Sequence, residues 1–113
     1  MQELFELFES MNYPYFRQGS VSDKEYPNSF FTFWNYATPI LKYRDDKSKI
    51  YSYDVMVYFY TDDPKLIYEV MDEFIVLAKE RGFLIDSKAY DTPTDKDNFF
   101  GRLVQIRIIK EDN

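Results

Sequence analysis

Cysteine and histidine are both absent from this chain, and each absence excludes a set of functions. Without cysteine there is no disulfide, no thiol nucleophile, no iron–sulfur ligation and no zinc site of the Cys/His type. Without histidine there is no Ser-His triad, no histidine general base and no metal site built on two histidines. Any catalysis would therefore depend mainly on carboxylates, hydroxyls and amines.

Glycine is scarce, and the three glycines stand alone at Gly19, Gly82 and Gly101. The chain therefore has no glycine-rich phosphate loop and no nucleophile elbow. Acidic residues gather at 45–46, at 62–63 and in the segment 91–97. These positions suit a hairpin tip, a helix cap and a polar connection, and the last one lacks the spacing of a calcium loop. We predict no catalytic, cofactor-binding or metal-binding residue, and a protein that is not an enzyme.

Long apolar runs are also missing, since none approaches the roughly 20 residues that a membrane span requires. Glu3, Glu6 and Glu9 interrupt the apolar N-terminus, which has no basic region of the kind that begins a signal peptide. With 20 acidic and 14 basic residues the formal charge is −6, which gives no long-range attraction to nucleic acid or to an anionic membrane. We expect a protein made in the cytoplasm, with no membrane partner.

Aromatic residues are what the chain has in excess: 11 Phe, 11 Tyr and one Trp make up 20% of its 113 residues. This length suffices for one domain with a stable core, and no linker or repeat divides it, so we predict a single domain over 1–113. A core of this size leaves aromatic side chains over, and such a surplus is typical of protein interfaces.

Two segments have the apolar spacing of amphipathic helices. In the first, the apolar positions are Leu4, Phe5, Leu7, Phe8 and Met11. They predict a helix over 2–11, which must end before Pro14. The second helix is predicted to have Asp63 as its cap and Pro64 as its first residue, and to stop at Gly82.

Runs of strand-favouring residues predict strands at 15–17, 30–36, 41–43, 50–60, 83–90 and 100–108, with a polar tail from Lys110. The run 50–60 alternates throughout: Tyr51, Tyr53, Val55, Val57 and Phe59 share one face, and Ser52, Asp54, Met56, Tyr58 and Tyr60 share the other. Such a period indicates a sheet with one face on the core. We expect an α+β fold in which an antiparallel sheet, or a mixed one, carries the N-terminal helix and one long helix on one face.

Helices on one face only would leave aromatic side chains exposed on the other face. The predicted interface residues are Trp34, Tyr36, Met56, Tyr58 and Tyr60. These residue types are enriched at the centres of interfaces, so we expect part of this face to contact another subunit. The alternative is that loops or the N-terminal helix cover it.

A basic cluster is predicted at the tip of the ribbon between 41 and 50, formed by Lys42, Arg44, Lys47 and Lys49. Aromatic residues stand near it, an arrangement found in proteins that bind single-stranded nucleic acid. Asp45 and Asp46 dilute this charge, which favours a solvated hairpin end instead. A small non-enzymatic binding module for protein or single-stranded nucleic acid is therefore the alternative function.

Three segments together suggest a known family: Tyr26-Pro27-Asn28-Ser29-Phe30-Phe31-Thr32-Phe33, Tyr58-Phe59-Tyr60-Thr61-Asp62-Asp63-Pro64, and Gly82-Phe83. With a helix before them, a charged ribbon between them and two closing strands after them, this layout resembles the small tail-completion or tail-terminator proteins of long-tailed bacteriophages. Such proteins are also called minor capsid or head–tail joining proteins. The resemblance covers nearly the whole chain.

The resemblance implies a structural protein of a phage or prophage virion that is not an enzyme. Members of this family fold as α+β domains and associate, typically as six-fold rings, on the end of the tail tube. The implied partners are further copies of the chain, the tail-tube protein and the head connector, and DNA only passes through. The implied location is the tail or neck of the virion. A ring needs two different contact surfaces on each subunit, which the ribbon and the outward aromatic residues would supply.

Overall fold

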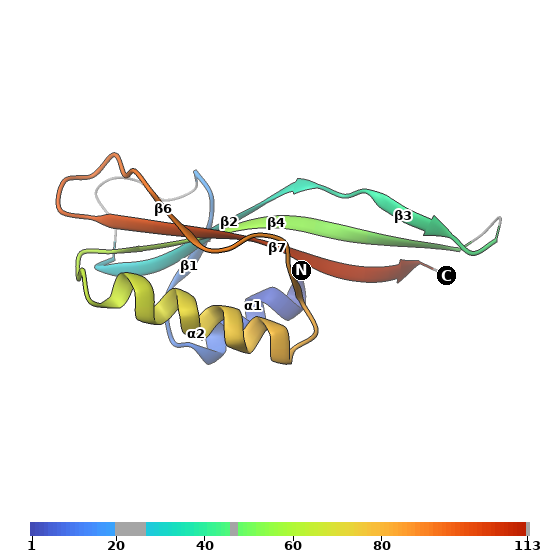
Figure 1. The fold of residues 1–113 in the computed structure, drawn as a ribbon, viewed down its shortest axis with the longest axis horizontal. Coiled ribbons are helices and arrows are strands. Elements are labelled where there is room, and N and C mark those ends of the chain that lie inside the picture. Colours follow the sequence, from blue (N-terminus) through green and yellow to red (C-terminus); the bar gives the residue numbers. More distant parts are fainter. Residues whose placement is uncertain (20–26, 46–47, 113) are drawn as a thin grey trace.

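The computed structural model describes residues 1–19, 27–45 and 48–112 (Figure 1). Within these ranges the chain forms two helices, α1 (Gln2–Ser10) and α2 (Leu66–Glu80), and one sheet of seven strands. The strands are β1 (Tyr15–Arg17), β2 (Ser29–Ala37), β3 (Ile40–Tyr43), β4 (Lys49–Thr61), β5 (Leu84–Ile85), β6 (Tyr90–Thr92) and β7 (Phe100–Asp112). The predicted α+β class is confirmed.

The sheet is mixed, with the order β1-β2-β4-β7-β5. Two short strands lie outside this order: β3 pairs with β4, and β6 pairs with β7. β1 runs parallel to β2, and all the other neighbouring strands are antiparallel. The longest ladder joins β4 to β7 without interruption, from Lys49 opposite Asp112 to Thr61 opposite Phe100. These two strands therefore form the spine of the molecule.

Both helices lie on one face of the sheet (Figure 1). The side chains without exposed surface at this contact are Leu4, Leu7, Phe8, Phe31, Val55, Val57, Phe59, Met71, Phe74, Ala78, Val104 and Ile106. The predicted alternation of β4 is confirmed, because its odd-numbered residues from Val55 to Phe59 are in this core. The rings of Phe8, Phe31 and Phe74 lie 4.8–5.8 Å apart between centroids, so they join α1, β2 and α2.

α2 begins at Leu66, two residues later than predicted. The Asp63 carboxylate accepts a hydrogen bond from the Lys65 backbone N–H at 2.9 Å, so Asp63 and Pro64 form a turn that precedes the helix. The predicted stop at Gly82 is confirmed. This glycine has a φ of +87°, and the N–H of Phe83 after it donates to the Ala78 carbonyl.

The prediction of one strand over 83–90 is wrong, because β5 and β6 are separate. The Asp86 N–H donates to the Gln105 carbonyl, but the Gln105 N–H donates to the Ser87 hydroxyl. A side chain here replaces a backbone acceptor, which interrupts the ladder. The prediction of a polar tail from Lys110 is also wrong, because β7 continues to Asp112 and the Lys110 ammonium binds the Glu3 carboxylate of α1.

One end of the sheet extends beyond the helices (Figure 1). This extension, called the arm, consists of residues 40–45, 48–52 and 108–112, from β3 and the adjoining ends of β4 and β7. The rest of the described chain is called the body. The molecule is elongated, with extents of 52 × 27 × 23 Å, and all four residues of β3 are exposed.

Candidate functional site

The face of the sheet that is turned away from the helices, called the open face, carries the predicted interface residues. Trp34 and Tyr36 are 41% and 37% exposed, and their ring centroids lie 5.9 Å apart. Met56 pairs with Trp34 on the neighbouring strand, and Tyr58 follows it; both are half-buried. These four residues, called the open-face patch, form an apolar surface that crosses β2 and β4.

Tyr60, the fifth predicted interface residue, lies in a second aromatic cluster at the end of the body. Its ring packs on Phe30, which is 2% exposed and also contacts the rings of Phe16 and Phe99. A Cβ on Gly101 would lie 2.9 Å from the Tyr60 ring, so this glycine provides space for the ring. Phe16 comes from β1 and Phe99 from the connection before β7, so Tyr60 is packed within the chain at this end of the open face.

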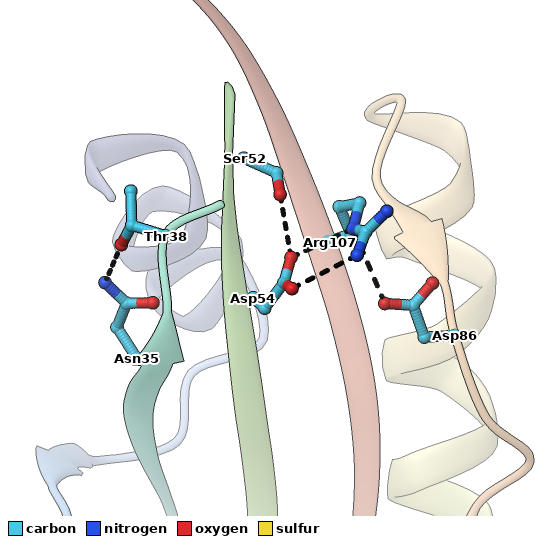
Figure 2. A network of polar contacts seen from close by, with 6 residues as sticks. All are labelled: Asn35, Thr38, Ser52, Asp54, Asp86 and Arg107. Carbon is cyan, nitrogen blue, oxygen red and sulfur yellow. Dashed lines mark hydrogen bonds and ion pairs between the residues drawn. The ribbon is translucent and has the colours of Figure 1, made fainter. Parts of the chain in front are cut away.

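An ion pair that the sequence did not indicate lies where the body meets the arm (Figure 2). Arg107 donates to both oxygens of the Asp54 carboxylate, from Nε at 2.9 Å and from Nη2 at 3.1 Å. The Ser52 hydroxyl donates to Oδ1 at 2.8 Å, and the Asp86 carboxylate lies 3.7 Å from Nε of Arg107. Asp54 is only 6% exposed.

Burial raises the pKa of the Asp54 carboxyl, but the hydrogen bonds from Arg107 and Ser52 and the positive charge of Arg107 more than offset this and lower the pKa below its ordinary value. The carboxyl is therefore ionised at neutral pH. On the other side of β4, the amide of Asn35 lies 2.9 Å from the Thr38 hydroxyl, at the point where the register between β2 and β4 shifts (Figure 2). This contact links β2 to the connection that leads into β3.

The basic residues predicted at the ribbon tip do not form a free basic cluster. Arg44 binds the Glu111 carboxylate at 2.7 Å, and the Lys49 ammonium lies 3.7 Å from the Asp112 carboxylate. Lys42 is exposed, and Lys47 lies outside the described residues. Because acidic residues at the end of β7 face these cations, the arm presents both signs of charge.

Net charge is divided unequally between the helices and the rest of the chain. α1 contains three glutamates and no basic residue, and α2 contains four acidic residues and one lysine. The two helices therefore account for the whole formal charge of −6, and the sheet with its connections is neutral overall. Two copies of the chain would repel each other through their helices, whereas the open face has no such barrier.

A hollow of about 540 Å³ lies at the edge of the second aromatic cluster, between Phe30, Tyr60 and the segment 93–99. In its described wall the Thr32 hydroxyl donates to Gln18, and the Lys96 ammonium lies over the Phe99 ring. We therefore assign it no chemistry. The described residues include no group of three or more acidic side chains placed to hold a metal ion, and no helix among them has the length and hydropathy to cross a membrane.

Comparison with models of known protein families found no match to this chain, and comparison with curated proteins found no significant match either. Any proposal about its function therefore depends on the sequence patterns and on two surfaces, the open-face patch and the arm.

Proposed function

We propose that this chain is a structural assembly protein of a bacteriophage or prophage virion. In this role it caps or completes the tail tube and joins it to the head, and it acts through contacts between subunits and with the tail-tube and head-connector proteins. The observation that carries the proposal is the unequal surface of the sheet. One face is buried under acidic helices, while the open face exposes the open-face patch.

Two further features support a role in assembly. The arm and the open-face patch are separate surfaces of one subunit, so each copy can make more than one contact in a ring, where unlike surfaces of neighbouring subunits meet. The acidic helices suit a surface that passing DNA does not bind, because like charges repel the phosphates. These features agree with the family resemblance of the sequence.

The proposal can be tested in the phage or prophage that carries the gene. Deletion should leave heads and tails that do not join, as seen by electron microscopy, and the wild-type gene should restore complete virions. A gene for Trp34→Ser/Tyr36→Ser should not restore them, although the purified variant folds. A gene for Val76→Ser, which changes an exposed apolar residue of α2, is the matched control and should restore them. Normal virions from the deletion strain would contradict the proposal.

The alternative is a module that binds single-stranded nucleic acid. One observation favours it, because aromatic side chains on an uncovered sheet face are suited to stacking on bases. Titration with fluorescent oligonucleotides at low salt distinguishes the two functions. A salt-dependent affinity that is lost when Lys42, Arg44, Lys47 and Lys49 are changed to Gln would support the module. No binding at low salt would exclude it, which is the result we expect since Arg44 and Lys49 already face carboxylates.

A further inference from the structure

The arm has two outer edges, and the one formed by β7 lacks a neighbouring strand over its last residues. The backbone N–H and carbonyl of Gln105 both point toward the β5 side, where they bond to Ser87 and Asp86. Backbone groups two residues apart on a strand point to the same side, so those of Ile109 and Glu111 also point outward. β5 pairs with β7 only as far as Arg107, so in the described structure no strand meets these groups.

The opposite edge of the arm is formed by β3. The Arg44 N–H donates to the Ser48 carbonyl across the hairpin, so the backbone groups of Tyr43 point away from β4. No other strand in the described part of the chain lies outside β3. Ile40, Leu41 and Tyr43 are all exposed, and Tyr43 reaches 68%. An exposed apolar edge of this kind is a template for pairing with another strand.

The two edges match each other in direction and in level. β3 and β7 are both antiparallel to β4, so they run parallel to each other. Ile50 of β4 lies opposite Lys42 on one side and opposite Glu111 on the other. A second copy placed beside the first, with its strands in the same direction, would therefore bring its Lys42 to the level of Glu111.

Charge also favours the pairing of unlike edges over like edges. The one charged residue of β3 is Lys42, and the turn after it carries Arg44 and Asp45, whereas the last two residues of β7 are Glu111 and Asp112. Two β3 edges would bring the cations together, which is unfavourable. The existing pairs Arg44–Glu111 and Lys49–Asp112 are largely exposed, so little is lost when their members change partners.

We propose that β3 of one copy pairs with β7 of the next, so that the arms of neighbouring copies join into one continuous sheet. This inference rests on the proposed function, because it assumes that the chain self-associates, and it names the surfaces that do so. The contact is heterologous, and such a contact closes a ring when the rotation between neighbouring copies divides a full turn. It also leaves the helices outside the contact, in agreement with their mutual repulsion.

Disulfide cross-linking tests the pairing directly, because the chain contains no cysteine that would give a background. Tyr43→Cys and Asp112→Cys place thiols at one level, both opposite Lys49 of β4. Within one copy these positions are two strands apart, about 10 Å, which is too far for a disulfide. Under conditions in which sedimentation shows association, a mixture of the two single variants should form a mixed dimer on oxidation. The double variant Tyr43→Cys/Asp112→Cys should form a ladder of linked oligomers.

The other outcomes overturn the inference in distinguishable ways. Efficient linking of either single variant to itself would mean that like edges pair. If copies of a Trp34→Cys variant form a disulfide and the arm variants do not, the contact lies on the open face. This result would contradict the edge pairing and leave the proposed function intact. No association of the protein with copies of itself, together with normal virions after gene deletion, would contradict both proposals.

Charge exchange provides a second test with a rescue. Lys42→Glu and Glu111→Lys should each lower the yield of the Tyr43–Asp112 cross-link by about tenfold, and the double exchange Lys42→Glu/Glu111→Lys should restore it. Glu80→Lys makes the same change of charge on α2 and should leave the yield unchanged. Circular dichroism establishes that each variant is folded. Failure of the double exchange to restore the yield would contradict the pairing of Lys42 with Glu111.

Discussion

The body and the arm share the same two central strands, but their surroundings differ. In the body, Val55 of β4 and Ile106 of β7 have no exposed surface, because α1 and α2 pack on them. In the arm the same ladder continues, yet Ile50 of β4 is half-buried, Ile109 of β7 is exposed, and all of β3 is exposed. One backbone structure thus serves two regions with very different burial.

The difference in burial means that different interactions stabilise the two regions. Burial of apolar surface stabilises the body. The arm depends on its backbone ladder, on exposed ion pairs and on the Asp54–Arg107 pair at its base. Since Ile40, Leu41 and Tyr43 of β3 are exposed within one copy, they are available to a partner. Substitutions in the two regions should therefore have separable effects on folding and on assembly.

The largest effect is expected for a truncation in the body. Phe74→Ala removes a fully buried ring that contacts Phe8 and Phe31, and it should lower the free energy of unfolding by about 3–5 kcal/mol. Urea unfolding followed by circular dichroism measures this loss. A change below 1 kcal/mol would mean that the helices do not pack on the sheet as described.

A smaller loss is expected at the base of the arm. Asp54→Asn removes the charge that Arg107 binds through two hydrogen bonds, and it should cost about 2 kcal/mol at pH 7. Hydrogen exchange should also become faster in the arm. Glu80→Gln, on the exposed surface of α2, is the matched control and should change stability by less than about 0.5 kcal/mol. Equal costs for the two variants would show that the pair does not support the arm.

The same pair predicts a dependence on pH. Because the pKa of Asp54 is lower in the folded protein than its ordinary value of 3.8, its contribution is present above that value and is lost as the pH falls through the folded pKa. The difference in stability between wild type and Asp54→Asn should therefore narrow below about pH 4. Urea unfolding of both proteins at pH 7 and pH 3 provides the comparison. A difference that stays constant or widens on acidification would contradict the lowered pKa.

The smallest effect on folding is expected at the edge of the arm. Tyr43→Ala changes a side chain with little burial, so the stability of the monomer should change by less than about 0.5 kcal/mol. Its effect should appear in assembly instead, as a loss of oligomer in sedimentation velocity at the same protein concentration. A loss of several kcal/mol on unfolding would mean that the arm depends on Tyr43 within one copy.

The sequence predicted the elements whose pattern is local. The period of α1, the alternation of β4 and the stop at Gly82 were all correct, because neighbouring residues along the chain determine them. The sequence left open whether the sheet is antiparallel or mixed, so it did not predict the parallel pairing of β1 with β2. The break between β5 and β6 depends on the Ser87 hydroxyl meeting Gln105, a contact between distant residues that no local pattern indicates.

The candidate surfaces were predicted in the same way. The open-face position of Trp34 and Tyr36 follows from alternation and from helices on one face. The packing of Tyr60 in the second aromatic cluster depends on Phe99, and the Asp54–Arg107 pair depends on the register of β4 against β7. Neither contact could be predicted from the sequence. An aspartate in a half-buried strand was the only available signal for that pair.

Fluorescence of Trp34 tests the central claim most directly, since this residue is the single tryptophan and lies in the open-face patch. If the chain assembles through its open face and arm, the emission of Trp34 should shift to shorter wavelength and become resistant to iodide quenching as oligomers form. Sedimentation of the same samples establishes the state of association. Oligomers in which Trp34 keeps the emission and quenching of the monomer would contradict assembly through this face.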